Sequence, residues 1–252
     1  MIYNRPEYWL AKTETVVPYL TFSSPSSFTL AVGDATKHWD GTLEYSTDTS
    51  TWSTWDGTTT LSSATSGSDN VLYLRGTGNT KIGYYDEANT EEYIPWKISG
   101  TDVRCNGNIE TLLDYATVEA GQHPTMAEEC FGGLFMGCTA LITPPELPAT
   151  TLASGCYSEM FYGCTALTQA PALPATTLAS YCYESMFSGC TSLKLSSTQS
   201  GEYTQEYRIP ASGTGTTAND ALTYMFTGTG GTFASTPKIN TMYYLSNTNA
   251  IV

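Results

Sequence analysis

One feature constrains this chain more than any other: a repeat of 26 residues between Cys130 and Leu193. The successive copies read CFGGLFMGCTALITPPELPATTLASG, CYSEMFYGCTALTQAPALPATTLASY and CYESMFSGCTSL. A fixed period of about 20 to 50 residues is typical of a solenoid, in which each unit buries its apolar side only against its neighbours. The period therefore predicts a stack of similar units across this stretch.

Each repeat joins a segment with a spacing of four to a segment broken by proline. Cys156, Met160 and Cys164 are four residues apart, which would place them on one face of a helix. Pro171 and Pro174 lack a backbone donor, so the segment around them is expected to be a short strand that ends in a turn. A short helix followed by a short strand is the unit of an α/β leucine-rich repeat solenoid.

The stretch GCTALTQAPALPATTLASYCYESMFSGCTSL resembles the BspA-like leucine-rich repeats of bacterial surface proteins and of proteins encoded by their phages. That family pattern is an aromatic pair, then GC-[TS]-x-L, then a strand that ends in proline. The resemblance covers about residues 101–245 and is strongest over 130–193. It implies adhesion to host molecules or to other cells, and it carries over no catalytic residue, because the family shares none.

The seven cysteines are an odd number, so they cannot all pair within one chain. Their spacings differ from the short C-x2-C and C-x4-C pairs of zinc sites. We expect buried thiols that act as small apolar residues, although bridges between stacked neighbours, a metal or a nucleophilic cysteine remain open. Besides Cys105, two columns recur with the repeat: Cys130, Cys156 and Cys182, and Cys138, Cys164 and Cys190.

Residues 18–100 are predicted to form an all-β sandwich. Seven short runs rich in Thr, Tyr, Val and Trp are separated by Gly, Asp, Asn and Ser, which favours a small antiparallel sandwich. The segment LEYSTDTSTWSTW resembles a hairpin of immunoglobulin-like modules that precede such repeats in phage and bacterial surface proteins. The runs are PYLTF, SFTLAV, TLEYST, TWSTW, TTTLSSA, NVLYLRG and YIPWKIS.

Residues 1–17 are interpreted as an N-terminal docking arm ahead of this sandwich. Pro6 prevents a regular helix there, and no apolar periodicity is present. A first edge strand or a disordered end is the alternative. The side chains expected to dock on a virion are Tyr3, Arg5, Tyr8 and Trp9.

Residues 101–252 are predicted to hold the solenoid and its caps. A helix with Ile109, Leu112, Leu113 and Ala116 on one face, capped by Asn108, should close the first end. The repeat is interrupted by a polar insertion at about residues 194–207, where solenoids often place a binding loop or a loop without function. A C-terminal cap should be anchored by Tyr243, Tyr244 and Leu245.

Charge and hydropathy narrow the classes of partner. Only 13% of the residues are charged and the net charge is −14, which opposes binding to nucleic acid or to an anionic membrane. No apolar run approaches the roughly 20 residues needed to span a bilayer, and the first residues lack the apolar centre of a signal peptide. We therefore favour synthesis in a host cytosol and release on a phage particle, with a trimmed export signal as the alternative.

No catalytic or metal-binding motif stands out, so no catalytic residue, metal or cofactor is assigned. His123 could face Cys130 or Cys105 as a Cys–His pair, but those cysteines are expected to be core residues. The segment YYDEANTEEY holds an acidic cluster that could bind calcium, although a solvated loop is favoured. A pair of carboxylates of a glycosidase is also possible, but nothing in the sequence selects one.

Aromatic residues make a binding function easier to support. Trp52 and Trp55 lie in an extended stretch, where one faces inward and the other outward, and an outward Trp beside Asp56 would form a platform for a sugar ring. Tyr162 and Tyr181 fall near the ends of turns in the repeats, where exposure is expected. Aromatic anchors with few charges suit recognition of a glycan or a protein.

Together these features predict a non-enzymatic surface protein of a bacteriophage virion, a fibre or decoration protein of head or tail. It would dock on other virion proteins through its N-terminus, adhere to a cell-surface glycan or protein, and lie outside the cell on the virion surface. A homo-oligomer, with a trimer as its expected form, follows because virion proteins often form trimers. A secreted bacterial leucine-rich repeat adhesin and a carbohydrate-active enzyme are the two alternatives.

Overall fold

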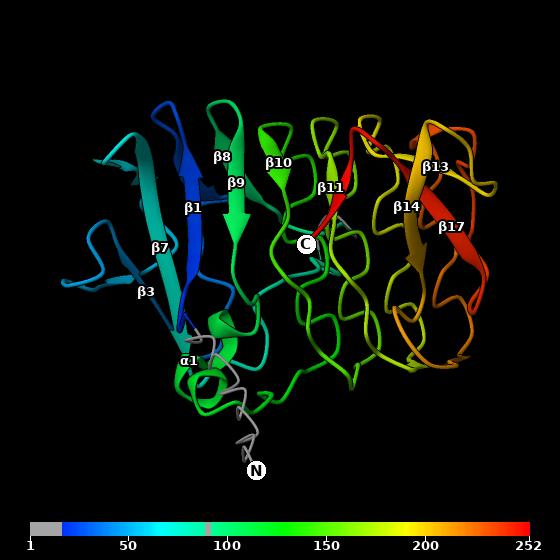
Figure 1. The fold of residues 1–252 in the computed structure, drawn as a ribbon. Coiled ribbons are helices and arrows are strands. Elements are labelled where there is room, and N and C mark those ends of the chain that lie inside the picture. Colours follow the sequence, from blue (N-terminus) through cyan, green and yellow to red (C-terminus); the bar gives the residue numbers. More distant parts are fainter. Residues whose placement is uncertain (1–16, 89–91) are drawn as a thin grey trace, which may run out of the picture.

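The computed structural model describes residues 17–88 and 92–252, and it is mostly β, with 30% strand and 4% helix. Several sheets lie side by side along one long axis, and a single short helix covers one end of the first (Figure 1). The predicted β-rich character is therefore confirmed. The docking residues Tyr3, Arg5, Tyr8 and Trp9 lie outside the described residues.

The N-terminal region contains two sheets, and every predicted strand run holds a strand. The larger sheet has seven strands in the order β10-β9-β1-β7-β3-β4 with β6 beside β7, and the smaller has the order β5-β2-β8. All pairs are antiparallel except β10 with β9. The strands are β1 (Leu20–Ser24), β2 (Thr29–Val32), β3 (Thr42–Ser46), β4 (Ser53–Trp55), β5 (Leu61–Ser62), β6 (Ala64–Ser66), β7 (Asp69–Thr77), β8 (Trp96–Ser99), β9 (Val103–Asn106) and β10 (Leu141–Thr143).

Aromatic rings fill the space between these two sheets. In β1, Leu20 and Phe22 are buried while the residues between and beside them are partly exposed, as the period of two in a strand requires. Trp55 of the larger sheet meets Trp96 of the smaller at 5.3 Å between ring centroids, and Trp39 packs on Trp55 at 5.1 Å. The two sheets thus share one apolar interior.

The single helix, α1 (Thr111–Glu119), packs against β7 at the end of the larger sheet. Its expected apolar face is only partly confirmed: Leu112 and Leu113 are buried, but Ala116 is exposed. The backbone of Asp114 is non-helical, so the face shifts, and Val118 is the buried residue of the second half. Asn108 was predicted to cap the helix, but it caps the turn before it. Its side-chain oxygen accepts a hydrogen bond from Glu110 N, one residue before the helix begins.

The repeats contain no helix among the described residues, so the predicted α/β unit is wrong in its helical half. Residues 128–138, 154–164, 180–190 and 219–229, here named the stacked turns, form a series of four-residue turns. In the second of them, Gly155, Glu159 and Gly163 have φ of +61°, +53° and +69°. A left-handed residue at every fourth position makes the chain reverse repeatedly, so residues four apart face the same way without a helix.

The backbone of each stacked turn is satisfied by its neighbour. Phe131 N donates to Cys156 O at 2.9 Å, and Tyr157 N donates to Cys182 O at 3.0 Å. The same register recurs at every second residue, while the residues between donate three positions back within their own turn, as Leu134 N does to Phe131 O. The 26-residue period therefore aligns successive layers, so that backbone N–H groups of one layer meet carbonyls of the next.

Columns of identical side chains run through the interior of these layers. Phe135, Phe161 and Phe187 stack at 5.6–5.8 Å with interplanar angles of 7–9°, and Phe226 continues the column at 5.6 Å. The thiol of Cys164 donates to Phe135 O at 3.0 Å. A second column holds Phe131, Tyr157 and Tyr183, and a second thiol contact of the same kind joins Cys190 to Phe161 O.

Both ends of the column of rings are closed by rings from other elements. Phe22 and Trp96 pack edge-on against Phe135, so the two-sheet region closes the first end, a role that was predicted for residues 101–129. Tyr207 and Phe233 pack edge-on against Phe226 at the other end. The strand pairing of β1, β9 and β10 also crosses the predicted boundary between residues 100 and 101.

The insertion at residues 194–207 forms part of a four-stranded sheet at the far end (Figure 1). Tyr243 and Leu245 are buried there, as predicted, while Tyr244 points to the partly exposed face. This sheet has the order β14-β17-β13-β16, and two pairs, β11 with β18 and β12 with β15, tie the repeats together. The strands are β11 (Gln169–Ala170), β12 (Thr177–Leu178), β13 (Lys194–Ser196), β14 (Tyr203–Arg208), β15 (Thr216–Thr217), β16 (Gly230–Gly231), β17 (Met242–Ser246) and β18 (Ala250–Ile251).

Candidate functional site

The best-formed surface feature is a groove between a protruding hairpin and the outer side of the stacked turns. Two adjoining open hollows of about 440 Å³ and about 360 Å³ make it up, and they share Tyr85, Tyr93 and Glu159. Tyr162 lines the first hollow, and Tyr181 and Glu184 line the second. We name this surface, defined by these six residues, the hairpin groove.

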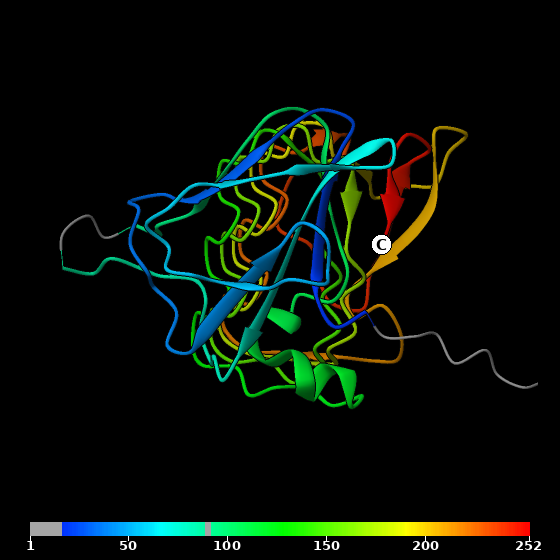
Figure 2. The same cartoon turned by 90° about the vertical axis from the view of Figure 1, so that its left-hand side faces the viewer.

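The two arms of the hairpin, residues 84–88 and 92–94, extend away from the sheets (Figure 2). Tyr85 and Tyr93 form a β-bridge, and Ile94 N donates to Tyr84 O at 2.8 Å. A Cβ placed on Gly133 would lie 2.2 Å from Cβ of Tyr93, and one on Gly132 would lie 2.5 Å from its ring. Because these two glycines of the first stacked turn have no side chain, Tyr93 packs directly against their backbone.

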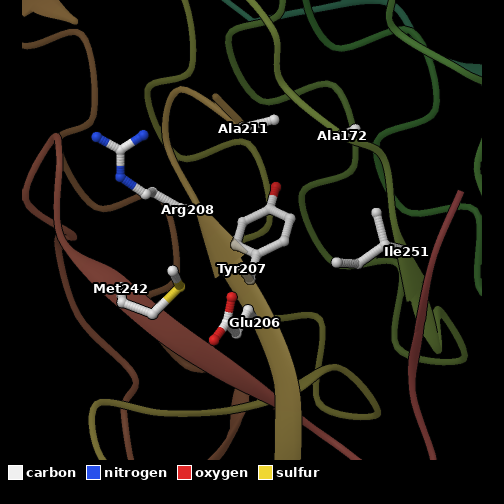
Figure 3. Close-up of a pocket in the computed structure, with 7 residues that line it drawn as sticks. All are labelled: Ala172, Glu206, Tyr207, Arg208, Ala211, Met242 and Ile251. Carbon is white, nitrogen blue, oxygen red and sulfur yellow. The ribbon is translucent and has the colours of Figure 1, made fainter. Parts of the chain in front are cut away.

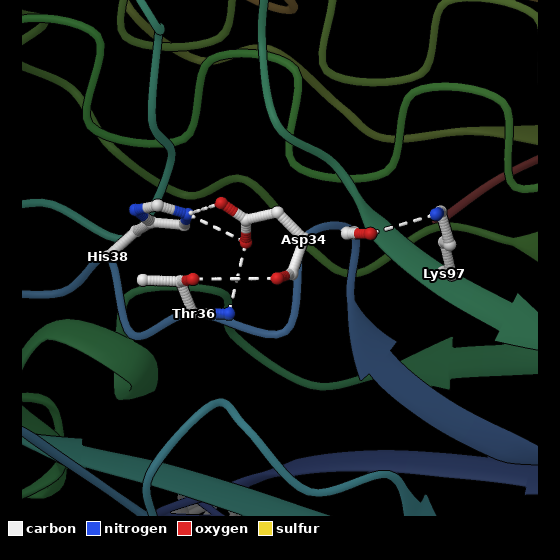
Figure 4. Close-up of polar contacts among 5 residues, drawn as sticks. Asp34, Thr36, His38 and Lys97 are labelled. Atoms are coloured by element: carbon white, nitrogen blue, oxygen red, sulfur yellow. Dashed lines mark hydrogen bonds and ion pairs between the residues drawn. The ribbon is translucent and has the colours of Figure 1, made fainter.

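A polar cluster holds the base of the hairpin (Figure 4). The ring of His38 stacks on Tyr84, with centroids 4.1 Å apart and planes 7° apart. His38 Nε2 lies 2.9 Å from a carboxylate oxygen of Asp34, whose other oxygen accepts from Thr36 N at 3.0 Å. His38 is thus a structural residue that fixes where the hairpin leaves the sheets.

Two of the predicted binding residues lie in the groove. Tyr162 and Tyr181 have 44% and 45% of their surface exposed, and so each presents a ring to solvent. Tyr181 has φ of +58°, a left-handed conformation that costs a non-glycine residue about 1–2 kcal/mol. The same conformation recurs at Glu129, Ser185 and Tyr224, so it belongs to the stacked turns, and the exposure of the ring is what makes Tyr181 a candidate for binding.

The groove also holds carboxylates that lack a cationic partner. Burial raises the pKa of Glu159, and Glu92 raises it further. Burial likewise raises the pKa of Glu184, with additional repulsion from Glu159 and Asp220. Neither Glu159 nor Glu184 forms an ion pair within residues 17–88 and 92–252, whereas Glu129 at the edge of the groove is 3.4 Å from Lys81 Nζ.

The predicted sugar platform at Trp52, Trp55 and Asp56 is arranged differently from the groove. Trp55 is 1% exposed and belongs to the core, so it cannot contact a ligand. Trp52 is the outward ring, but the guanidinium of Arg75 covers it at 4.1 Å. Asp56 accepts hydrogen bonds from the backbone and hydroxyl of Thr58, and its carboxylate thereby stabilises the turn after β4.

His123 and the cysteines have structural positions in the fold. His123 faces Glu110, with Nδ1 2.7 Å from the carboxylate, and not Cys130 or Cys105 as suggested. Burial raises the pKa of Glu110, and the contact with His123 opposes that shift. All seven cysteines are buried free thiols, as expected, and burial raises the pKa of Cys138 and Cys190 to about 12.

A smaller hollow of about 180 Å³ lies beside β14 (Figure 3). Tyr207 points across it and donates to Pro171 O at 3.1 Å, so the ring ties the insertion to the repeats. Arg208 is turned toward Pro210 O, with 3.1 Å between the atoms. Tyr207 and Arg208 are both engaged by neighbouring backbone carbonyls, and this hollow is the smaller one, so it is less suited to a ligand than the hairpin groove.

Neither a family model, nor a curated protein, nor a solved structure matches this chain. Among the described residues, no group of three His, Cys, Asp or Glu side chains could hold a metal ion, and no helix is long and apolar enough to cross a membrane. The geometry of the groove, with exposed rings and acceptor oxygens around an open hollow, is suited to binding a hydroxyl-rich ligand.

Sequence reasoning missed four of the six groove residues: Tyr85, Tyr93, Glu159 and Glu184. The one signal was the first repeat itself, in which Gly132 and Gly133 replace the Ser-Glu and Glu-Ser pairs of the later copies. Loss of both side chains from one layer marks a place where another segment packs closely.

Proposed function

We propose that this chain is a non-enzymatic binding protein displayed on the surface of a bacteriophage particle, where it adheres to a cell-surface glycan through the hairpin groove. The stacked turns would then be a leucine-rich repeat solenoid of the BspA-like kind, reduced to turns and short strands, and the two-sheet region an immunoglobulin-like module. The observation that carries the binding function is the pair Tyr162 and Tyr181, both about half exposed beside an open hollow.

A sugar ring has one apolar face and a rim of hydroxyl groups, and aromatic side chains offer rigid area for the face at low entropic cost. The carboxylates Glu159 and Glu184 supply acceptors for the hydroxyls. The display on a particle is supported by the low charge of the surface and by the resemblance of the repeats to adhesive surface proteins. The N-terminal residues 1–17 would provide the attachment.

The test is binding of the purified full chain to a glycan array and to intact bacterial cells. Tyr162→Ala with Tyr181→Ala should reduce binding at least about tenfold, since each stacked ring contributes on the order of 1 kcal/mol or more. Tyr224→Ala is the matched control, because Tyr224 is equally a left-handed, exposed tyrosine (58% exposed) but does not line the groove. Equal loss in both variants, or turnover of a glycan, would contradict the proposal.

The virion part needs its own measurement. Native particles that carry this chain should show it in their protein content and in a cryo-EM density map, with residues 1–17 against a capsid or tail protein. Particles that lack the chain would support the secreted bacterial adhesin in its place.

A further inference from the structure

We infer that the hairpin groove recognises an amino sugar through its free, protonated amine, so that the glycan it takes is a de-N-acetylated one. This inference rests on the proposed glycan-binding function and adds to it the charge of the ligand. A neutral sugar would pack on the aromatic rings of the groove, but it would leave the carboxylates of Glu159 and Glu184 without a cationic partner.

The first argument is the arrangement of Glu159 and Glu184. They belong to neighbouring layers of the stacked turns, where Glu159 N donates to Glu184 O at 2.9 Å. The two residues are therefore neighbours in the ladder, each is partly buried, and the charge of Glu159 raises the pKa of Glu184. With no lysine or arginine paired to either among the described residues, a cation from outside is the missing partner.

The second argument is the aromatic surround. Tyr85, Tyr93, Tyr162 and Tyr181 bring four phenol rings to the same groove as the two carboxylates. The face of an aromatic ring attracts a cation and also packs on the apolar face of a sugar. Rings and carboxylates together are suited to an ammonium group carried on a pyranose ring, because each class of side chain contacts a different part of that ligand.

The third argument excludes the simplest competitor. A bare divalent cation prefers three or more protein oxygens, and among the described residues no three acidic, histidine or cysteine side chains converge. The volumes of about 440 Å³ and about 360 Å³ are also far larger than an ion requires. A lysine or arginine side chain of a protein partner shares the charge, and the experiment below separates it from a sugar.

The deciding experiment compares two hexasaccharides with the same β-1,4 backbone, one of glucosamine and one of N-acetylglucosamine. Isothermal titration of the full chain should show binding of the glucosamine hexamer that is at least about tenfold tighter, the factor expected from one charge-assisted hydrogen bond. The preference should decrease as salt is raised, because exposed charges are screened.

Each other outcome has a defined meaning. Equal affinity for both hexamers would overturn the inference and leave the glycan-binding function standing. Binding to a lysine-rich peptide but to neither hexamer would overturn both and indicate a protein partner. Binding to other, neutral glycans of the array, lost in the tyrosine variants, would overturn only the preference for an amine.

Variants test whether the two carboxylates supply the preference. Glu159→Gln with Glu184→Gln keeps shape and hydrogen bonding but removes the charge, and it should abolish the preference for the glucosamine hexamer. Glu202→Gln with Glu206→Gln is the matched control, since both residues are exposed acids outside the groove. If the control pair weakens binding equally, the effect belongs to the overall charge of −14 and the inference fails.

The variant with Glu159→Gln and Glu184→Gln should also be more stable than the original chain at pH 7. Two glutamates that only stabilised the fold would give the opposite result. Folding raises the pKa values of Glu159 and Glu184, so the unfolded state ionises at a lower pH than the folded state does. Stability is therefore lost as pH rises past the unfolded pKa values, and this cost is present at pH 7. Replacing them by glutamine removes that cost. A gain in melting temperature together with a loss of binding is the expected pair of results, and a lower melting temperature would contradict it.

Discussion

The two-sheet region and the stacked turns bury side chains by different rules. In β1 the buried residues alternate with partly exposed ones, and the strand pairs with β7 on one side and β9 on the other. In the stacked turns, long runs such as residues 155–158 are buried without alternation, and the inner layers pair with the layers before and after them. Cohesion in the first region comes from a shared interior, and in the second from correct stacking of successive layers.

The difference also decides where each region can present function. A strand exposes every second residue, so its outward face is broad and, in this chain, mainly Thr and Ser. A stacked turn exposes few residues, and several of them have left-handed backbones: Glu159, Tyr181 and Tyr224 have φ of +53°, +58° and +57°. These are positions that glycine would occupy at no conformational cost, as Gly155 and Gly133 do in the same two columns.

The largest expected effect comes from removing one ring of the central column. Phe161→Ala should lower the free energy of unfolding by about 3–5 kcal/mol, because the cavity separates Phe135 from Phe187. Hydrogen exchange should then accelerate in the layers on both sides, residues 128–138 and 180–190, since they pair with this layer. Chemical denaturation and amide exchange are the measurements.

Phe28→Ala is the matched change in the two-sheet region, where Phe28 is 2% exposed. A similar loss of free energy is expected, but faster exchange should stay within the two sheets. If Phe161→Ala speeds exchange only within its own layer, residues 154–164, the layers are independent of one another, which would contradict what the hydrogen-bond ladder implies.

The next effect separates close packing from backbone conformation in one turn. Gly133→Ala should destabilise by about 1–3 kcal/mol from the clash with Tyr93, in addition to the cost of φ +59°. Gly137→Ala has a similar φ of +73° but no atom within 4 Å, so it should cost only about 1–2 kcal/mol. Thermal unfolding of the two variants measures the difference, and Tyr93→Gly, which removes Cβ together with the ring, should erase it.

The stacked turns show how much of the fold the sequence predicts. The 26-residue period is visible without a structure, and it predicts the stacking of Phe161 on Phe135 and the burial of the cysteines. The helix was predicted wrongly because four-residue turns place Cys156, Met160 and Cys164 on the same side as a helix of 3.6 residues per turn does. The recurring glycines Gly137, Gly163 and Gly189 suit the left-handed end of a turn as well as the end of a helix, so they did not separate the two.

The candidate site was less predictable, for a physical reason. Tyr162 and Tyr181 follow from their places in the repeat, but the other half of the groove comes from the two arms of the hairpin. Contact between Tyr93 and Gly133 joins positions about forty residues apart, and no local pattern encodes it. Trp52 was a reasonable expectation from strand alternation, yet the guanidinium that covers it comes from Arg75 on another strand.

A pH titration distinguishes the thiol columns of the stacked turns from apolar packing. Burial raises the pKa of Cys190 from 9.0 to about 12, so the folded state keeps its proton while the unfolded state loses it. Stability is therefore complete below pH 9 and falls as pH rises toward 12, by about 1.4 kcal/mol per pH unit for each such thiol. Denaturation at pH 8 to 11 should show this slope reduced in Cys190→Ala.

Leu193→Ala is the control for that slope, because Leu193 is also fully buried beside the same turn but does not titrate. It should lower stability equally at every pH. An unchanged slope in Cys190→Ala would mean that the thiol ionises as readily in the folded protein as in the unfolded one, which would contradict its burial.

The smallest expected effect bears most directly on the contrast between inner and outer positions. Tyr181→Gly removes an exposed ring and relieves a left-handed residue of about 1–2 kcal/mol of strain, while added freedom of the unfolded chain offsets about 0.4–1 kcal/mol of that gain. These two terms leave a gain of about 0–1.6 kcal/mol in unfolding free energy, and loss of the half-buried ring offsets part of it, yet glycan binding should fall. Tyr183→Gly, two residues along and 1% exposed, should instead cost about 3–5 kcal/mol. Equal destabilisation by the two variants would make Tyr181 a structural residue. A Tyr181→Gly variant that folds as stably as the original chain but loses glycan binding would show that the ring serves the ligand and that the fold does not need it.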